Sequence, residues 1–418
     1  MSATSPFVGV RVFSDLRSNV VSIDTRDSTA IGMVLPAPAA DTGLFPLNQV
    51  VLIDTEDTAL VAELGAGVAL DAVNQIVSEG ITANILFVRV QHSVLTDVDA
   101  KLTAEMGAIV GSAAAKTGVY ALLDAKAHVG IEPGFIIAPG YTNTRPGNLK
   151  NPVAAAIDTV AAQIIDCMAV VDCTLTNQAA AITYASDFAT SLNIIAAYPA
   201  VQVMLGGQIV TRPMSPHIAA AHVRRDKETG TPFKAAWNRP LKGILGLSTP
   251  ISYRDGDPAC QANLLVQAGI ATVIENTTLW APFTTATDAT VKAYRSIKRI
   301  RTRRSIEKAI QPAMRAYLSE DLGPHLVLLI TEALSQACSE RKALGALVDY
   351  EVVWKRGINT NTTLRDGILR LKLRFEETPD LVDLQIFSEP QPEAFDVLAG
   401  EIAAALQRMG NPNVTVAA

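Results

Sequence analysis

The residues of this sequence that come closest to a metal or acid–base site are two histidines in the middle of the chain. His217 and His222 are five positions apart, whereas two ligands on one helical face need a spacing of three or four. We therefore expect surface or interface histidines. The sequence predicts no catalytic residue and no metal ligand.

Two loops resemble nucleotide-binding motifs without completing them. Gly65-Ala-Gly67 lacks the third glycine of the dinucleotide-binding fingerprint. Residues 111–117 (GSAAAKT) carry Ala115 where a P-loop has the glycine directly before its lysine, and that glycine lets the backbone wrap a phosphate. The chain also lacks a G-x-S-x-G nucleophile elbow. We therefore predict no cofactor and no enzymatic activity.

The four cysteines stand outside any C-x-x-C metal motif. Cys167 and Cys173 flank a predicted strand of about 20 Å, which exceeds the roughly 7 Å Cα limit of a disulfide, so they cannot bridge each other. Buried thiols are one explanation. The alternative is a disulfide between copies of the chain, formed outside a reducing compartment by one or more of Cys167, Cys173, Cys260 and Cys338.

One charged cluster stands out in a chain whose net charge is −6: three Lys and five Arg lie between residues 292 and 308. The cluster is either a docking face for an acidic partner or a solvated helix flank offset by nearby acids. Direct nucleic-acid binding is disfavoured, because this stretch has hardly any aromatic side chain for base stacking, Tyr294 excepted.

The length of 418 residues predicts two or three domains. No apolar run reaches the eighteen or more residues of a membrane span, so we expect no stable membrane insertion. The first residues lack the basic and apolar regions of a secretory signal, which predicts no signal peptide and synthesis in a cytoplasm.

The middle of the chain alternates predicted strands and helices, and these elements must position the histidines, cysteines and basic residues described above. Predicted strands at 135–138, 168–171 and 193–197 alternate with predicted helices at 152–165 and 177–189, which predicts a parallel, doubly wound sheet. The composition changes near residue 285, where we place the major division. The remaining predicted elements are strands at 30–35, 50–54, 85–90, 271–275 and 346–354 and helices at 69–79, 215–226, 306–318, 324–342 and 393–409.

Both ends of the chain contain strand patterns. Residues 368–375 (ILRLKLRF) and 381–387 (LVDLQIF) alternate apolar and polar side chains around a turn, which predicts a hairpin. Isolated strand-like segments are formed at the two termini by Phe7, Val8, Val10, Val12 and Phe13 and by Val414, Thr415 and Val416. An isolated strand leaves backbone groups unpaired, so these ends are either frayed termini or strands donated to neighbouring copies.

The most specific motifs of the chain lie between residues 213 and 310. Residues 213–230 (PMSPHIAAAHVRRDKETG) and 234–238 (KAAWN) resemble the signature P-P-S-G-x-x-A-G-x-x-A-R-x-D-x-x-x-G … K-A-P-A-N of contractile phage tail sheath proteins. Further similarities to this family lie at 263–270 (NLLVQAGI), 279–281 (LWA), Arg301-Thr302 and 306–310 (IEKAI). Departures from the signature stand at Met214, Pro216, Ala220 and Ala281.

The resemblance implies a structural subunit of a contractile tail sheath. Such a subunit polymerises as stacked hexameric rings around a tail tube and contracts by rigid-body rearrangement to drive the tube through the host cell envelope. The implied fold is α/β and α+β multidomain: a doubly wound, subtilisin-like α/β sheet plus a C-terminal α+β sheath domain with strand-donating N- and C-terminal arms. The expected divisions are an arm at 1–25, part of the core at 26–90, an outer non-catalytic α/β region at 91–285, an inner domain at 286–409 with the hairpin 368–387, and an arm at 410–418.

The resemblance also implies partners: other copies of the chain, a tail tube protein, and baseplate and tail terminator proteins, in a virion tail assembled in the host cytoplasm. The sheet that accepts donated strands is expected to contain Leu369, Leu371, Leu373, Phe375, Val382, Leu384 and Ile386. The side chains expected to face an acidic tube are Lys298, Arg299, Arg301, Arg303 and Arg304.

Two other readings stay open. The first is the sheath of a tailocin or of an extracellular contractile injection system, which the sequence separates poorly from a phage sheath. The second is a Rossmann-like α/β enzyme, which the incomplete nucleotide and nucleophile motifs disfavour.

Overall fold

The computed structural model describes residues 29–409 and residue 415. The strand predicted at 7–13 and the residues Val414 and Val416 lie outside this part, and Thr415 is exposed and in no regular element. By its internal contacts the chain divides into a unit Met1–Asp380 and a unit Leu381–Ala418. A search of the described residues found no helix with the length and apolar character of a membrane span.

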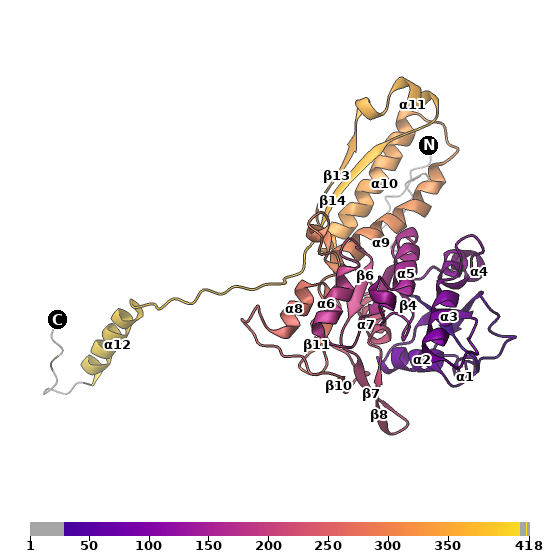
Figure 1. Cartoon of the computed structure of the whole chain (residues 1–418). Helices are drawn as coiled ribbons and strands as arrows, with labels where there is room; N and C mark the ends of the chain where they lie inside the picture. The colour runs from indigo at the N-terminus through magenta and orange to yellow at the C-terminus, as the bar shows by residue number, and fades with distance from the viewer. Residues whose placement is uncertain (1–28, 410–414, 416–418) are drawn as a thin grey trace, which may run out of the picture. The chain divides into compact units, whose positions relative to one another are not determined.

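The first unit is built on a large, mainly parallel sheet. Its strands in the described residues are β1 Ile31–Pro36, β2 Val50–Asp54, β3 Asn84–Val90, β4 Phe135–Ile137, β5 Met168–Asp172, β6 Ile194–Ala197, β9 Arg239–Pro240, β11 Ile270–Ile274 and β12 Thr278–Trp280. The order is β2-β3-β1-β4-β5-β6-β11-β12-β9, with β3 through β11 parallel. At the edges β2 pairs antiparallel with β3, β12 with β11, and β9 with β12. Figure 1 labels β4, β6 and β11 of this sheet.

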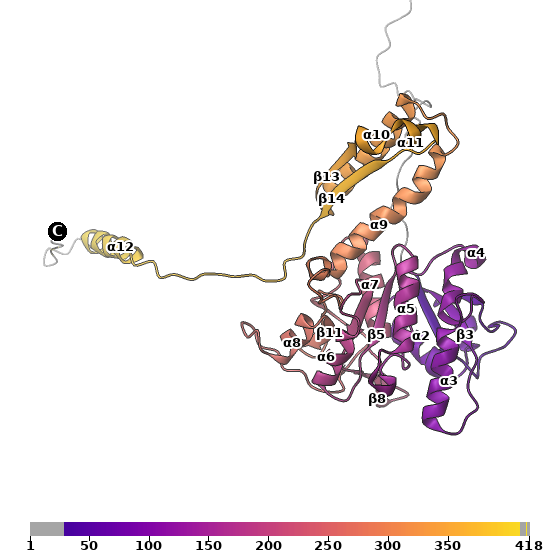
Figure 2. The ribbon, with the colours of Figure 1, turned by 45° about the horizontal axis from the view of Figure 1, so that its top comes forward.

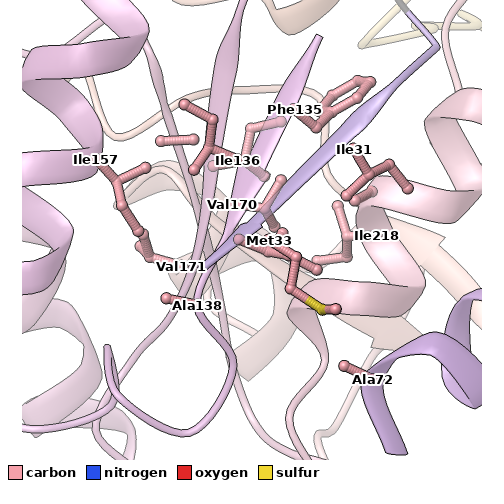
Figure 3. Close-up of a cluster of buried hydrophobic side chains, with 14 of the residues drawn as sticks. Ile31, Met33, Ala72, Phe135, Ile136, Ala138, Ile157, Val170, Val171 and Ile218 are labelled. Atoms are coloured by element: carbon pink, nitrogen blue, oxygen red, sulfur yellow. The ribbon is translucent and has the colours of Figure 1, made fainter. Parts of the chain in front are cut away.

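Helices cover both faces of this sheet, which explains why β1 and β5 are buried at every position. The helices α2 Val68–Ser78 and α7 Ser215–Thr229 pack together, and α3 Val98–Val110 packs on α5 Pro152–Gln163. Figure 3 shows Ile218 of α7 and Ala72 of α2 on one side of the strands and Ile157 of α5 on the other. Shorter helices of this unit are α1 Thr58–Ala62, α4 Ala125–Val129, α6 Gln178–Ser186 and α8 Gln261–Gln267. A small separate sheet consists of β7 Val201–Leu205, β8 Gln208–Arg212 and β10 Gly246–Leu247.

Beyond β12 the chain leaves the large sheet and forms a smaller layer of two helices and a two-stranded sheet (Figure 2). Its elements are α9 Ile297–Met314, α10 Pro324–Ala343, β13 Leu347–Trp354, α11 Asn361–Arg365 and β14 Leu371–Glu377. The alternation in β14 turns Leu371, Leu373 and Phe375 toward the helices, where they join two small apolar clusters. We call this part, residues 297–380, the C-terminal layer.

Two predicted features are wrong. Strands β1 to β3 share one sheet and one continuous core with β4 to β6, so no domain boundary lies between residues 90 and 91. The hairpin 368–387 does not form: β14 pairs antiparallel with β13, and residues 381–387 carry no regular secondary structure. The strand at 347–354 competes for the same partner, and its pairing buries the apolar face of β14 against α9 and α10.

The second unit contains one helix in its described part, α12 Ala394–Arg408. The segment 381–393 before it has no helix or strand. Its apolar side chains Leu381, Leu384, Ile386 and Phe387 are exposed.

We predict that Gly269→Ala destabilises the first unit more than Gly130→Ala does. Both glycines have positive φ, 77° and 81°, which costs an alanine about 1 kcal/mol. At Gly269 an added Cβ would also lie 2.4 Å from the Thr284 carbonyl oxygen, whereas nothing lies within 4 Å at Gly130. Urea denaturation should show an additional loss of ~1–3 kcal/mol for Gly269→Ala. Equal losses would contradict the close approach at the start of β11.

Candidate functional site

The C-terminal layer is joined to the large sheet by a buried ion pair. Arg301 of α9 donates two hydrogen bonds to the Asp226 carboxylate of α7, at 3.0 and 2.5 Å, and both side chains are almost fully buried. The guanidinium also lies 4.8 Å from the centre of the Phe135 ring at the start of β4. One arginine thus contacts the central helix and the central part of the sheet.

The two histidines of α7 are buried inside the first unit, so the expectation of surface or interface histidines is wrong. The ring of His222 stacks on Phe135 with centroids 5.3 Å apart. Burial lowers the pKa of His222 to about 3, and the nearby Arg301 charge acts in the same direction, which keeps this imidazole neutral. The central position of α7 in the unit decides this burial.

A second buried group, Glu79, ties three segments together at the C-terminal end of α2. Its carboxylate contacts His217 Nδ1 at 2.9 Å and accepts hydrogen bonds from Arg224 at 2.5 Å and from the backbone N–H groups of Lys242 and Gly243 at 2.9 and 3.2 Å. Burial acts to raise the pKa of Glu79, but the bonds from His217 and the loop outweigh it, so the pKa is lowered. The carboxylate is therefore held in its charged form.

A third buried carboxylate, Asp172, closes β5 against the start of α7. It accepts hydrogen bonds from the backbone N–H groups of Met214 and Ser215, both at 2.9 Å, and from Ser215 Oγ at 2.5 Å. The hydroxyl of Ser215 therefore bonds an acid, while the nearby His217 bonds Glu79. The groups that could suggest nucleophilic chemistry here stabilise the junction of strand and helix.

These contacts give a structural role to the sequence motifs. Arg224 and Asp226 stand at the Arg and Asp of the signature in residues 213–230, and Arg301 stands in the later motif. Sequence reasoning missed Glu79, the partner of Arg224, and Asp172, the partner of Ser215. Their only local signal is a position directly after a helix or at the end of a strand.

The cations predicted to face a tube are engaged within the chain. Lys298 pairs with Asp380 at 3.3 Å. Arg303 pairs with Glu377 at 2.5 Å, and Arg299 with Glu376 and Glu377. Arg304 donates to the Cys167 carbonyl at 2.9 Å and to Asn193. The helix begins at Ile297, earlier than predicted, and its basic side chains fasten α9 to β14 and to the large sheet. The buried position of Arg301 contradicts its assignment to a tube-facing surface. For Lys298, Arg299, Arg303 and Arg304 that assignment stays a prediction.

All four cysteines are free and buried, with Cys260 the most accessible at 7%. A disulfide between copies would require a thiol to leave this buried position. The structure therefore favours the buried-thiol explanation over the inter-subunit alternative.

The two-stranded sheet of the C-terminal layer is incomplete at both edges. Within the described residues β13 and β14 pair only with each other, so each leaves one row of backbone groups without a strand partner. Its expected members Val382, Leu384 and Ile386 lie outside this sheet, and Leu369 precedes β14. A free edge of this kind can accept an added strand.

The described residues contain no cluster of three or more His, Cys, Asp or Glu side chains that could hold a metal ion.

Comparison with known proteins finds relatives along nearly the whole chain. A prophage major tail sheath protein of Pseudomonas aeruginosa (strain UCBPP-PA14) is 28% identical over 379 residues, covering 89% of this chain and 93% of that protein. The tail sheath protein of Escherichia phage P2 is 23% identical over 390 residues, covering 90% and 94%. No family model matches.

The fold is similar to that of a solved sheath. The contracted helical sheath of the anti-feeding prophage, determined by cryo-electron microscopy, superimposes with a TM-score of 0.67 at 17% identity, over 93% of this chain and all of that one. Its mixed α/β architecture with several sheets is thus shared.

We predict that Arg301→Met costs the first unit ~3–5 kcal/mol, because it leaves the Asp226 charge buried without its bidentate partner. The matched control is Arg374→Met on the outer face of β14, whose pair with Glu351 is 64% and 58% exposed and should contribute less than about 1 kcal/mol. Chemical denaturation compares the two. A loss at Arg301 no larger than that at Arg374 would show that the buried pair does not hold α9.

We predict that Asp172→Asn becomes more stabilising as the pH rises. Burial raises the pKa of Asp172 to about 6, although Ser215 and the backbone N–H groups lower it. The folded protein therefore binds this proton more tightly than the unfolded chain, so the contribution of Asp172 is largest below pH ~4 and is lost as the pH rises through about 6. The stability of the variant relative to the natural chain should rise by ~2–3 kcal/mol between pH 4 and 7.

Thermal melts across this range measure the difference. In the control Asp349→Asn the difference should stay nearly flat across this range, because the bond to Lys342 lowers the pKa of Asp349 and its contribution is lost only below pH ~4. A flat difference for Asp172→Asn would refute the buried-acid assignment.

Proposed function

We propose that this chain, a homologue of contractile tail sheath proteins, is the structural subunit of a contractile sheath. In this role it polymerises as stacked hexameric rings around a tail tube and contracts by rigid-body rearrangement of its subunits, which drives the tube through the host cell envelope. The similarity to tail sheath proteins along about nine-tenths of the chain supports this function.

The single structural observation that carries the proposal is the incomplete sheet of the C-terminal layer together with an unpaired strand-like segment in the same chain. Among residues 29–409 the sheet β13–β14 has two free edges, and a two-stranded sheet alone is marginally stable. Residues 381–387 alternate, with Val382, Leu384 and Ile386 on one face, and lie exposed in the second unit. Pairing this segment with an edge of the β13–β14 sheet in another copy gives hydrogen-bond partners to the backbone groups of the segment and of the edge.

Strand donation links subunits without fixing their mutual orientation. A donated strand of seven residues makes about 4–6 backbone hydrogen bonds at roughly 0.5–1.5 kcal/mol each, and the linkage is repeated along a polymer. Donation by the terminal segments 7–13 and 414–416 remains part of the same proposal. The tethers act as hinges while the sheath changes diameter.

The buried contacts make the first unit suited to move as a rigid body. Arg301, Glu79 and Asp172 each join separate elements inside it. The ion pair of Lys298 with Asp380 holds the last residue of the first unit, directly before the donated segment 381–387. Energy for contraction is then stored during assembly, in an extended sheath that is metastable relative to the contracted one.

We propose the finer details of the fold and the partners on the same basis. The large sheet is a doubly wound, subtilisin-like region without catalytic function, and the C-terminal layer is the inner domain. The partners are further copies of the chain, a tail tube protein, and baseplate and tail terminator proteins, and the assembly is a virion tail. A tailocin or injection-system sheath is the second candidate, favoured by the similarity in fold to the anti-feeding prophage sheath.

We predict that Leu384→Pro abolishes sheath assembly while leaving soluble, folded subunits, because proline removes a backbone donor in the middle of the donated strand. The matched control is Gln391→Pro, which lies between Pro390 and Pro392 outside the strand. Deletion of residues 1–14 should also prevent polymerisation. Negative-stain electron microscopy should show striated hollow cylinders for the natural chain and the control only. Cylinders of normal length from Leu384→Pro would exclude donation by residues 381–387.

A further inference from the structure

The helix α12 has an apolar face that nothing covers within the described part of its unit. Phe395, Leu398, Ile402 and Leu406 recur at helical spacing on one face, and all four side chains are exposed. A helix of 15 residues is marginal in water unless its apolar face is buried. The helix therefore requires a surface on which to pack.

The start of this helix and the linker before it are strongly acidic. Residues 388–401 contain Glu389, Glu393, Asp396 and Glu401 and no Lys or Arg. No ion pair joins these four acids to another side chain in the described residues. The surface that receives α12 should accordingly combine apolar side chains with cations.

The first unit has such a surface at the end of the C-terminal layer farthest from the large sheet, where α11 lies (Figure 1). We call it the distal end, residues 354–370. Its apolar side chains Trp354, Ile358, Leu364 and Ile368 are 38–48% exposed. It also carries Lys355, Arg356, Arg365 and Arg370, against a single acid, Asp366.

The cations of the distal end differ from those of α9. Four basic side chains of α9 pair with carboxylates of the same chain: Lys298, Arg299, Arg301 and Arg303. The four cations of the distal end form no ion pair in the described residues, and the Arg370 guanidinium donates to the Ile358 carbonyl. An acidic ligand is therefore free to pair with them.

We propose that α12 of one copy binds the distal end of a second copy, with apolar face on apolar face and acids on cations. The proposal rests on the proposed function, because a polymer joined by residues 381–387 delivers α12 to its neighbour. The linker of six residues, 388–393, reaches about 20 Å when extended, close to the length of a seven-residue strand. The helix can therefore follow the donated strand to the end of the accepting sheet, at high effective concentration.

Cysteine cross-linking of the full-length chain tests the contact. One tagged copy carries Leu398→Cys, and a differently tagged copy carries Leu364→Cys. After assembly and mild oxidation, a reducible heterodimer should form from the mixture but from neither variant alone, since the four natural thiols are buried. A double variant that gives only an intrachain cross-link would overturn the proposal, as that result places α12 on its own chain.

Charge exchange tests the electrostatic part. Arg356→Glu with Arg365→Glu in the receiving copy should reduce the heterodimer yield at least about five-fold at low salt. Glu393→Lys with Glu401→Lys in the donating copy should restore at least about half of it. The control pair Lys234→Glu with Arg254→Glu, both exposed and outside the β13–β14 sheet, should leave the yield within about two-fold. If the exchanged charges do not restore the yield, the proposed binding of α12 to the distal end is overturned.

Electron microscopy of the same samples separates the two proposals. Cylinders without the heterodimer would overturn the α12 contact and leave the sheath function standing. A heterodimer in samples that never form cylinders would support the α12 contact and overturn the sheath function.

Discussion

The structure depends on the burial of a single guanidinium, that of Arg301. An arginine taken out of water is costly unless its charge and its donors are matched, and Asp226 supplies a bidentate carboxylate from the central helix α7. The ring of Phe135 covers the same group. Since Arg301 lies in the second turn of α9, this pair fixes how the C-terminal layer leaves the large sheet.

Two other buried polar groups, which the sequence analysis did not single out, have similar structural roles. Glu79 joins α2, α7 and the loop at 242–243, and Asp172 joins β5 to the start of α7. Such fully hydrogen-bonded buried groups favour one packing arrangement over others. The sequence motifs shared with sheath proteins therefore describe how a rigid body is held together.

The first unit is held by buried polar contacts, and these contacts end at the boundary with the second unit. The last of them is the pair of Lys298 with Asp380, and the next residue begins the second unit. Beyond it the described residues expose strand-like and helical apolar faces. Rigid bodies joined by such tethers suit an assembly that changes its shape while its subunits remain connected.

The sequence by itself determined the elements that depend on local periodicity. The strand at 50–54 was predicted at its observed bounds, and the helices from 152 and 215 begin where predicted, because the period of apolar residues reports which faces are buried. The signature in residues 213–230 also pointed to the sheath family. Only the tertiary structure decided that β14 pairs with β13, that His217 and His222 are buried, and that most cations of α9 pair with carboxylates of the same chain. Strand pairing, burial and ion pairing join residues far apart in sequence, and no local pattern records which distant partner is chosen.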